Sequence, residues 1–285
     1  MKKVVIKFLV FWCGTKCNLK CKDCCNLIPY IKQISFDADQ IVEDLIFVSK
    51  RAKILSLQLQ GGEIFTHPQA AYIIQRVALM DIPKISITTN ATIKLKDDVI
   101  EALKRNPHVW ITLSNYECTR EKRLEFIKYL KECGITNFRE YDFCFGSGEW
   151  FSSGGIYENK KSEEEAKKNF IECEEKYCLT LADGRLYTCG KILAINQLHN
   201  VSHNRYSIFD IRKWRIKNQA EKLQFKERNT DEEFLQFVDF INNSRTIYKE
   251  ECKYCNIDKN IRIKPAIQLS KEEILEIKKW QKILE

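Results

Sequence analysis

Cys17-Asn18-Leu19-Lys20-Cys21-Lys22-Asp23-Cys24 is the stretch of sequence that decides the fold. It follows an apolar run that predicts a β-strand over residues 4–11. Charged and polar residues separate the three cysteines, so the stretch is a poor candidate for the hydrophobic core. We expect a loop whose thiolates converge on one soft metal centre.

The spacing of these cysteines indicates what the metal centre is. A structural zinc site normally has four ligands, and no fourth Cys or His follows at zinc-finger spacing. Cys-x3-Cys-x2-Cys after a first strand resembles the signature of the radical S-adenosylmethionine (SAM) family. The resemblance implies that Cys17, Cys21 and Cys24 hold a [4Fe-4S] cluster whose open iron chelates SAM, and that SAM is cleaved reductively to a 5′-deoxyadenosyl radical. Asp23 stands where the family usually has an aromatic residue. Cys25 directly follows Cys24, so Cys25 remains an alternative to Cys24 as the third ligand.

Composition limits the class of protein. The 285-residue chain is 44% hydrophobic and 30% charged, and it has no apolar run long enough to span a membrane. Thirteen cysteines without an export signal favour metal or redox chemistry over disulfides. The net charge of +8 is spread along predicted helices without a recognition motif. We therefore expect a cytoplasmic protein that works at low oxygen and binds neither membrane nor nucleic acid.

Strand and helix patterns alternate along the first half of the chain. The predicted strands are residues 4–11, 53–60, 84–89, 109–113 and 136–145, and the predicted helices are residues 37–51, 68–80, 96–105 and 120–133. Repeated strand–helix units with short connections predict parallel strands and right-handed crossovers, which is an α/β fold. The family resemblance narrows this fold to a partial (β/α)6 TIM-like barrel.

The second half of the chain has a different pattern. A stretch rich in Gly and Ser at residues 146–155 predicts a boundary, so we divide the chain into a radical SAM core, residues 1–150, and a C-terminal extension, residues 151–285. The extension is predicted to contain a β-hairpin at residues 179–188, with Asp183-Gly184 in its turn. The predicted helices of the extension are residues 162–176, 208–228, 231–242 and 271–284.

Polar residues at the strand ends are candidates for binding SAM. Ligands bind at the carboxyl ends of parallel strands, and Gly61-Gly62-Glu63 follows the second strand. This tripeptide resembles the Gly-Gly-Glu motif that binds the amino group of SAM in the family. The resemblance also implies that Asn90 and Ser114, which end the next two strands, contact the carboxylate and the ribose of SAM.

A second group of cysteines lies in the extension: Cys173, Cys178, Cys189, Cys252 and Cys255. These residues alone do not decide whether the site binds zinc or iron, because thiolate ligands suit both metals. The group resembles the twitch or SPASM extension of radical SAM enzymes, in which Gly-x4-Cys on a hairpin and a later Cys-x2-Cys bind an auxiliary [4Fe-4S] cluster. Five cysteines allow one such cluster, which favours twitch. We expect Cys189, Cys252 and Cys255 as ligands, while Cys173 and Cys178 compete for the fourth position.

The resemblance implies a radical SAM enzyme that takes a hydrogen atom from its substrate and completes a two-electron oxidation at the auxiliary cluster. Only 16 residues precede Cys17, which favours a small molecule such as a sugar, nucleotide sugar or cyclitol. Flavodoxin or ferredoxin would supply electrons. One alternative is an enzyme that modifies a peptide. Its reaction would be a step of RiPP maturation, an epimerisation, or an oxidation similar to that of a sulfatase maturase. Epimerisation would need a thiol such as Cys118 or Cys144. A non-catalytic metal-binding module is the other alternative.

Overall fold

One eight-stranded sheet organises the fold of the computed structural model, which describes residues 3–141, 148–152, 160–199, 201–215, 230–255 and 257–284. In sheet order the strands are β11 (Ile208–Asp210), β10 (Arg185–Tyr187), β9 (Leu179–Ala182), β2 (Leu9–Trp12), β4 (Ser56–Gln60), β5 (Lys84–Thr89), β6 (Val109–Ser114) and β7 (Phe138–Tyr141). The strands from β9 to β7 are parallel to one another, whereas β10 is antiparallel to both β9 and β11. The predicted α/β class is therefore confirmed.

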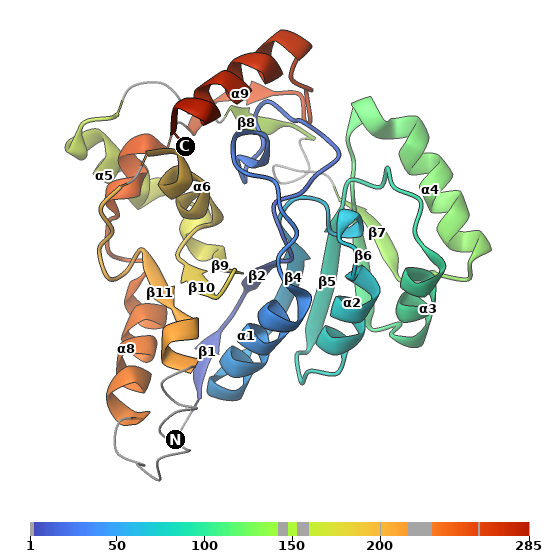
Figure 1. Ribbon diagram of the computed structural model, residues 1–285, viewed down its shortest axis with the longest axis horizontal. Helices are drawn as coiled ribbons and strands as arrows, with labels where there is room; N and C mark the ends of the chain where they lie inside the picture. The colour runs from blue at the N-terminus through green and yellow to red at the C-terminus, as the bar shows by residue number, and fades with distance from the viewer. Residues whose placement is uncertain are drawn as a thin grey trace.

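The helices of the first half follow the strands in chain order. They are α1 (Ala38–Arg51), α2 (Ala70–Ala78), α3 (Asp97–Arg105) and α4 (Arg120–Glu132), and they lie along the β2-to-β7 part of the sheet (Figure 1). Asp37 caps α1 by accepting a hydrogen bond from Gln40 N at 2.9 Å, as its position predicts. Every residue of β2 is buried, which is expected of a central parallel strand covered on both faces.

Two predicted strands are each interrupted. β1 (Val4–Ile6) pairs with β3 (Ala52–Ile54), and the ladder resumes three residues further along each strand, between β2 and β4. Ile6 pairs with Ile54 and Leu9 with Leu57, so the register is the same on both sides of the gap. The interruption therefore breaks the hydrogen-bonded ladder, but each side chain stays on the same face of the sheet.

The predicted hairpin is confirmed, and it joins the sheet of the core. Ala182 pairs with Arg185 across a turn in which Asp183 and Gly184 both have positive φ, and β9 pairs in parallel with β2. The hairpin thus extends the sheet on the β2 side. The division at residue 150 remains a prediction.

The predicted helix over residues 208–228 is wrong at its start. Residues 208–210 form β11, and a helical turn follows at residues 211–215; residues 216–229 lie outside the described part of the chain. Phe209 explains the strand, because it pairs with Leu186 of the hairpin and its ring lies 5.9 Å from that of Trp214 and 5.6 Å from that of Phe237. Tertiary packing here overrides the local helical pattern.

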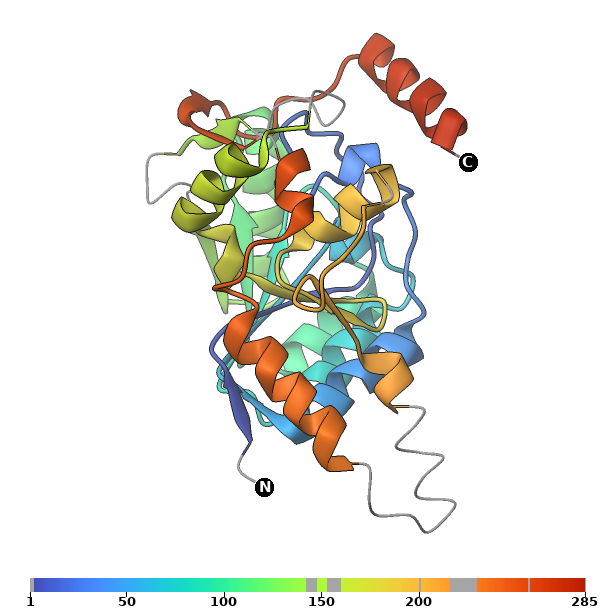
Figure 2. The same ribbon diagram turned by 90° about the vertical axis from the view of Figure 1, so that its left-hand side faces the viewer.

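The remaining elements cover the extension. Its helices are α5 (Glu163–Glu172), α6 (Gly190–His199), α8 (Thr230–Asn243) and α9 (Lys271–Leu284), and a strand pair that the sequence did not predict joins β8 (Trp150–Ser152) to β12 (Asp258–Ile263). Short 3-10 helices are η1 (Ile28–Tyr30), η2 (Ile64–Thr66), η3 (Glu117–Thr119), η4 (Glu175–Tyr177) and η5 (Glu250–Tyr254). Figure 2 shows α9 projecting from the end of the molecule opposite α8. Among the described helices, none is both long and apolar enough to cross a membrane.

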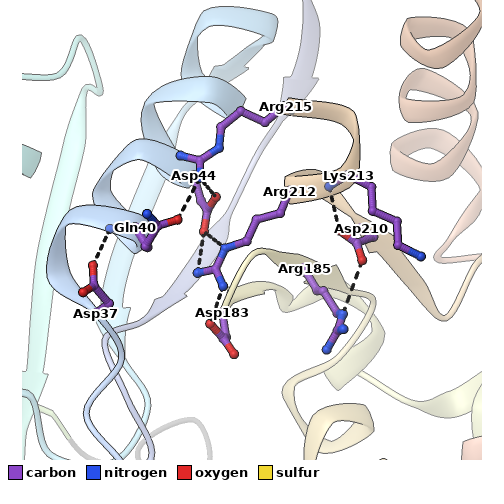
Figure 3. Close-up of polar contacts among 9 residues, drawn as sticks. All are labelled: Asp37, Gln40, Asp44, Asp183, Arg185, Asp210, Arg212, Lys213 and Arg215. Atoms are coloured by element: carbon purple, nitrogen blue, oxygen red, sulfur yellow. Dashed lines mark hydrogen bonds and ion pairs between the residues drawn. The ribbon is translucent and has the colours of Figure 1, made fainter. Parts of the chain in front are cut away.

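A buried ion-pair cluster ties the extension to α1 (Figure 3). Asp44 of α1 is fully buried, and its Oδ2 lies 3.0 Å from Arg212 Nη2. Arg212 Nη1 also contacts Asp183 Oδ1 in the hairpin turn at 2.8 Å, and Arg215 Nη2 lies 3.7 Å from Asp44 Oδ1. Buried charges of this kind depend on their partners, so the cluster holds α1, the hairpin and residues 211–215 together.

Candidate active site

The three predicted iron ligands lie on one loop, residues 13–27, which we call the cysteine loop. Cys21 is buried, Cys17 and Cys24 are half-buried, and their thiols act on one another electrostatically. Burial raises the pKa of Cys17 and of Cys21 to about 12. These thiols therefore keep their protons until a soft metal ion displaces them, and the donor set fits an iron–sulfur cluster.

Cys25 differs from its three neighbours. Its side chain is exposed, and its Sγ donates to Asn26 Oδ1 at 3.7 Å. Asn26 Nδ2 in turn donates to Gly61 O at 3.0 Å, which connects this end of the loop to the Gly-Gly-Glu segment.

The Gly-Gly-Glu segment is fastened to the cysteine loop through its backbone. Gly62 N donates to Gly14 O at 3.0 Å, and Glu63 N donates to Lys16 O at 2.8 Å. A Cβ atom on Gly62 would lie 2.1 Å from Lys16 O, and one on Gly61 would lie 2.3 Å from Gly14 O. The backbone of the cysteine loop therefore fills the space beside these two glycines.

Glu63 is buried between the carboxyl ends of β4 and β5. Its Oε1 accepts hydrogen bonds from Thr89 Oγ1 at 2.9 Å and Phe65 N at 3.2 Å, and its Oε2 accepts one from Asn90 N at 2.8 Å. Burial outweighs these donors and raises the pKa of Glu63 to about 7. The site therefore has a carboxylate that a nearby cation would stabilise in its ionised form.

Asn90 and Ser114 are both buried at strand ends, as predicted, and both have partners within the protein. Asn90 Nδ2 donates to Asn18 Oδ1 at 2.9 Å and lies 4.0 Å from Cys17 Sγ, so Asn90 helps to hold the cysteine loop. Ser114 accepts a hydrogen bond at its backbone oxygen from Tyr116 N at 3.0 Å.

Tyr116 is a site residue that the sequence interpretation missed. Burial holds its pKa well above the usual value, and its phenol lies within electrostatic range of Cys21, Cys24 and Cys25. Its ring packs edge-on against Trp150 at 5.4 Å. An aromatic residue two positions beyond the end of β6 was the only signal available in the sequence.

A segment near the end of the sequence, residues 266–273, binds the cysteine loop. Lys22 N donates to Ile267 O, and Leu269 N donates to Lys20 O, both at 2.8 Å. Gln268 accepts from Lys20 N at 2.7 Å and donates from Nε2 to Cys21 Sγ at 3.3 Å. The contacts continue into α9, whose Glu273 pairs with Lys22 Nζ at 2.8 Å. No motif in the sequence indicated this partner.

The structure brings the second cysteine group into one region. η5, which contains Cys252, packs against α5 and α6. The end of α5 is followed by Cys173, and the start of α6 is preceded by Cys189. Cys173 interacts electrostatically with Cys178, Cys189, Cys252 and Cys255. Cys173 and Cys178 are equally half-buried, so the choice between them stays open.

The other thiols considered in the sequence are less informative. Cys118 is exposed and its Sγ donates to Ala266 O at 3.3 Å, while Cys144 lies outside the described residues. Among the side chains that the structure describes, no three of His, Cys, Asp or Glu lie close enough together to hold a single metal ion.

Comparison with known proteins decides the family of the first half. Residues 13–149 match the radical SAM superfamily. This part of the chain belongs to the radical SAM superfamily. The match begins at the cysteine loop and ends beside β8, so SAM binding and iron–sulfur chemistry apply to the domain that carries Cys17, Cys21, Cys24 and Glu63.

Solved structures of radical SAM enzymes resemble the chain at low sequence identity. BtrN in complex with AdoMet and 2-DOIA is 14% identical, with a TM-score of 0.51 over 94% of this chain and 98% of BtrN. SuiB of Streptococcus suis bound to S-adenosylmethionine is 19% identical, with a TM-score of 0.38 over 48% of this chain and 32% of SuiB. The aligned region thus spans about a third of SuiB. A comparison with curated proteins gave no match.

Proposed function

We propose that the chain is a radical SAM enzyme that removes a hydrogen atom from a small-molecule substrate and completes a two-electron oxidation. The proposed architecture is a partial (β/α)6 barrel, residues 1–150, followed by a twitch-like extension, residues 151–285. The observation that carries the proposal is the cysteine loop of a radical SAM domain, held against the buried carboxylate of Glu63.

The proposed roles in SAM binding follow from the positions of the residues. Cys17, Cys21 and Cys24 hold the [4Fe-4S] cluster, which supplies the electron that splits SAM into methionine and a 5′-deoxyadenosyl radical. Glu63 accepts a hydrogen bond from the SAM ammonium group, because Oε2 has one protein donor and a second lone pair. Asn90 and Ser114 contact the SAM carboxylate and ribose.

The extension provides the second cofactor in this proposal. Cys189, Cys252 and Cys255, with either Cys173 or Cys178, bind an auxiliary [4Fe-4S] cluster, which supplies an acceptor for the electron of the substrate radical. The packing of η5 against α5 and α6, and the electrostatic interaction of Cys173 with the other four cysteines, support this role. A soluble reductant such as flavodoxin or ferredoxin delivers electrons, and the protein works in a cytoplasm poor in oxygen.

A small molecule is the first substrate class to test. BtrN, whose fold aligns along nearly the whole chain, holds 2-DOIA. SuiB has been solved with the precursor peptide SuiA, and a peptide is therefore the second class. An oxidised product has two hydrogen atoms fewer than its substrate, whereas an epimerised product has the same formula as its substrate.

Iron content and SAM cleavage test the proposal. Anaerobically reconstituted protein should hold about eight irons if two four-iron clusters form. Changing Cys17, Cys21 and Cys24 together to Ala should halve the iron and abolish reductant-dependent release of 5′-deoxyadenosine, because only the auxiliary cluster remains. Cys133→Ala, at the end of α4, is the control and should retain both properties. A triple variant that keeps all its iron would refute the assignment, and a colourless zinc protein would support a non-catalytic module.

A further inference from the structure

The indole N–H of Trp12 is a buried hydrogen-bond donor without an acceptor. Trp12 is the last residue of β2, and its exposed fraction is 0%. Within the described part of the chain, no atom accepts a hydrogen bond from its Nε1. A donor buried in this way has lost its hydrogen bond to water and has gained none in return, which is unfavourable unless an acceptor binds beside it. The surroundings of the indole therefore indicate which acceptor fits.

The indole ring packs against Gly190, the first residue of α6. A Cβ atom on Gly190 would lie 2.8 Å from Trp12 Cζ2 and 3.5 Å from Trp12 Cε2. Nε1 is bonded to Cε2, so the unpaired N–H lies on the side of the ring that is closest to Gly190. The absence of a side chain at Gly190 allows this close approach. Gly190 directly follows Cys189, so the N–H lies one residue away from a proposed cluster ligand.

The neighbouring strand places a second proposed ligand beside the same ring. Thr180 of β9 lies on the same face of the sheet as Trp12, because its register partner on β2 is two positions before Trp12. Thr180 Oγ1 would lie 3.4 Å from the same Cβ atom of Gly190, and it donates a hydrogen bond to Cys178 O at 2.9 Å. Trp12 therefore packs where the backbone arrives from both Cys178 and Cys189.

The start of α6 adds backbone donors at this point. The first N–H groups of a helix have no acceptor within the helix, and the positive end of the helix dipole lies there. α6 has ten residues and begins at Gly190, so these N–H groups and Trp12 Nε1 lie together next to Cys189. An anion with several acceptor atoms fits this arrangement, and the sulfur atoms of a cluster held by thiolates are such acceptors.

We propose that Trp12 Nε1 donates a hydrogen bond to a sulfur atom of the auxiliary cluster, either the Cys189 thiolate or a sulfide, and thereby raises the reduction potential of that cluster. The inference rests on the proposed function for the existence of the cluster. Hydrogen bonds to sulfur favour the reduced cluster, because its extra electron makes the sulfur atoms stronger acceptors. A residue of the first half of the chain thus sets how readily the extension accepts the electron of the substrate.

Pulsed EPR spectroscopy tests the hydrogen bond itself. In the protein with Cys17, Cys21 and Cys24 changed to Ala, the auxiliary cluster can be reduced and observed alone. Labelling the indole nitrogens with ¹⁵N should reveal a hyperfine coupling between the reduced cluster and one indole nitrogen. Trp12→Phe should lose this coupling, whereas Trp110→Phe, at an exposed position of β6, should keep it. Absence of the coupling from the labelled parent protein would overturn the inference, and this measurement needs no tryptophan variant.

The reduction potential of the auxiliary cluster gives a second test. Trp12→Phe keeps an aromatic ring in the core but removes the donor. In the background without the first three cysteine ligands, this change should shift the midpoint potential to a more negative value in a spectroelectrochemical titration. Trp110→Phe removes the same N–H from a residue that is 48% exposed, so it should leave the potential unchanged. An unchanged potential in Trp12→Phe would also overturn the inference.

The failure of the proposed function would be recognised separately. If the variant without Cys17, Cys21 and Cys24 binds no iron, the auxiliary cluster is refuted and this inference with it. If that variant binds iron but shows no coupling to an indole nitrogen, the role of Trp12 alone is refuted.

Discussion

In the proposed function, Glu63 is the residue whose protonation state affects SAM binding. With a pKa of about 7, its carboxyl group is mostly protonated at pH 6 and mostly ionised at pH 7.5. The ammonium group of SAM favours the ionised form, so the affinity for SAM should rise roughly five- to tenfold between these pH values. Equilibrium binding of SAM to anaerobically reconstituted protein at a series of pH values would measure this change.

Glu63→Gln shows whether the pH dependence belongs to this residue. The amide cannot ionise, so the variant should bind SAM more weakly and with the same affinity at pH 6 and 7.5. Glu121→Gln on the exposed surface of α4 is the matched control and should behave as wild type. Wild-type affinity that is flat across this range would exclude Glu63 as the partner of the SAM ammonium group.

At the scale of the element, the docking of the Gly-Gly-Glu segment on the cysteine loop is the feature to test. Gly62→Ala would place a methyl group 2.1 Å from Lys16 O, and because that atom is backbone, the loop must move. We expect loss of about four irons, those of the cluster on the loop, with the auxiliary cluster retained. Iron analysis and the absorbance of the remaining cluster would measure this loss.

A glycine with open space around it is the control for this steric effect. Gly134 has a φ of +76° after α4, and a Cβ atom there would meet nothing within 4 Å. Gly134→Ala should therefore cost about 1 kcal/mol of stability and leave the iron content unchanged. Full iron content in Gly62→Ala would show that the loop tolerates the displacement.

The elements also show what the sequence could and could not predict. Periodicity and the Asp183-Gly184 turn were sufficient for the alternating core and the hairpin, because these signals are local. β11 was predicted as helix, since its strand state depends on Phe209 packing against Trp214 and Phe237. The hydrogen bond from Gln268 to Cys21 was missed because 247 residues separate the two, and a single glutamine carries no pattern.

At the scale of the whole molecule, the Asp44 cluster joins the two halves of the chain. Asp44→Asn removes the charge that compensates Arg212 and Arg215, and we expect the free energy of unfolding to fall by about 3 kcal/mol. Urea denaturation of the iron-free protein would measure this change. Asp183 pairs with the same Arg212 but its side chain is 47% exposed, so Asp183→Asn should cost less than about 1 kcal/mol. Equal losses in the two variants would show that burial does not decide the strength of these pairs.

The contacts between residues 266–273 and the cysteine loop have a consequence for the time at which the site is completed. A ribosome makes the loop first and reaches Gln268 247 residues after Cys21, which at about 5 to 20 residues per second is a delay on the order of 10 to 50 s. During that interval the growing chain carries Cys21 without the segment that later bonds to it. A metal ion that reaches the loop before Gln268 has been made therefore meets Cys21 without the hydrogen bond from Gln268.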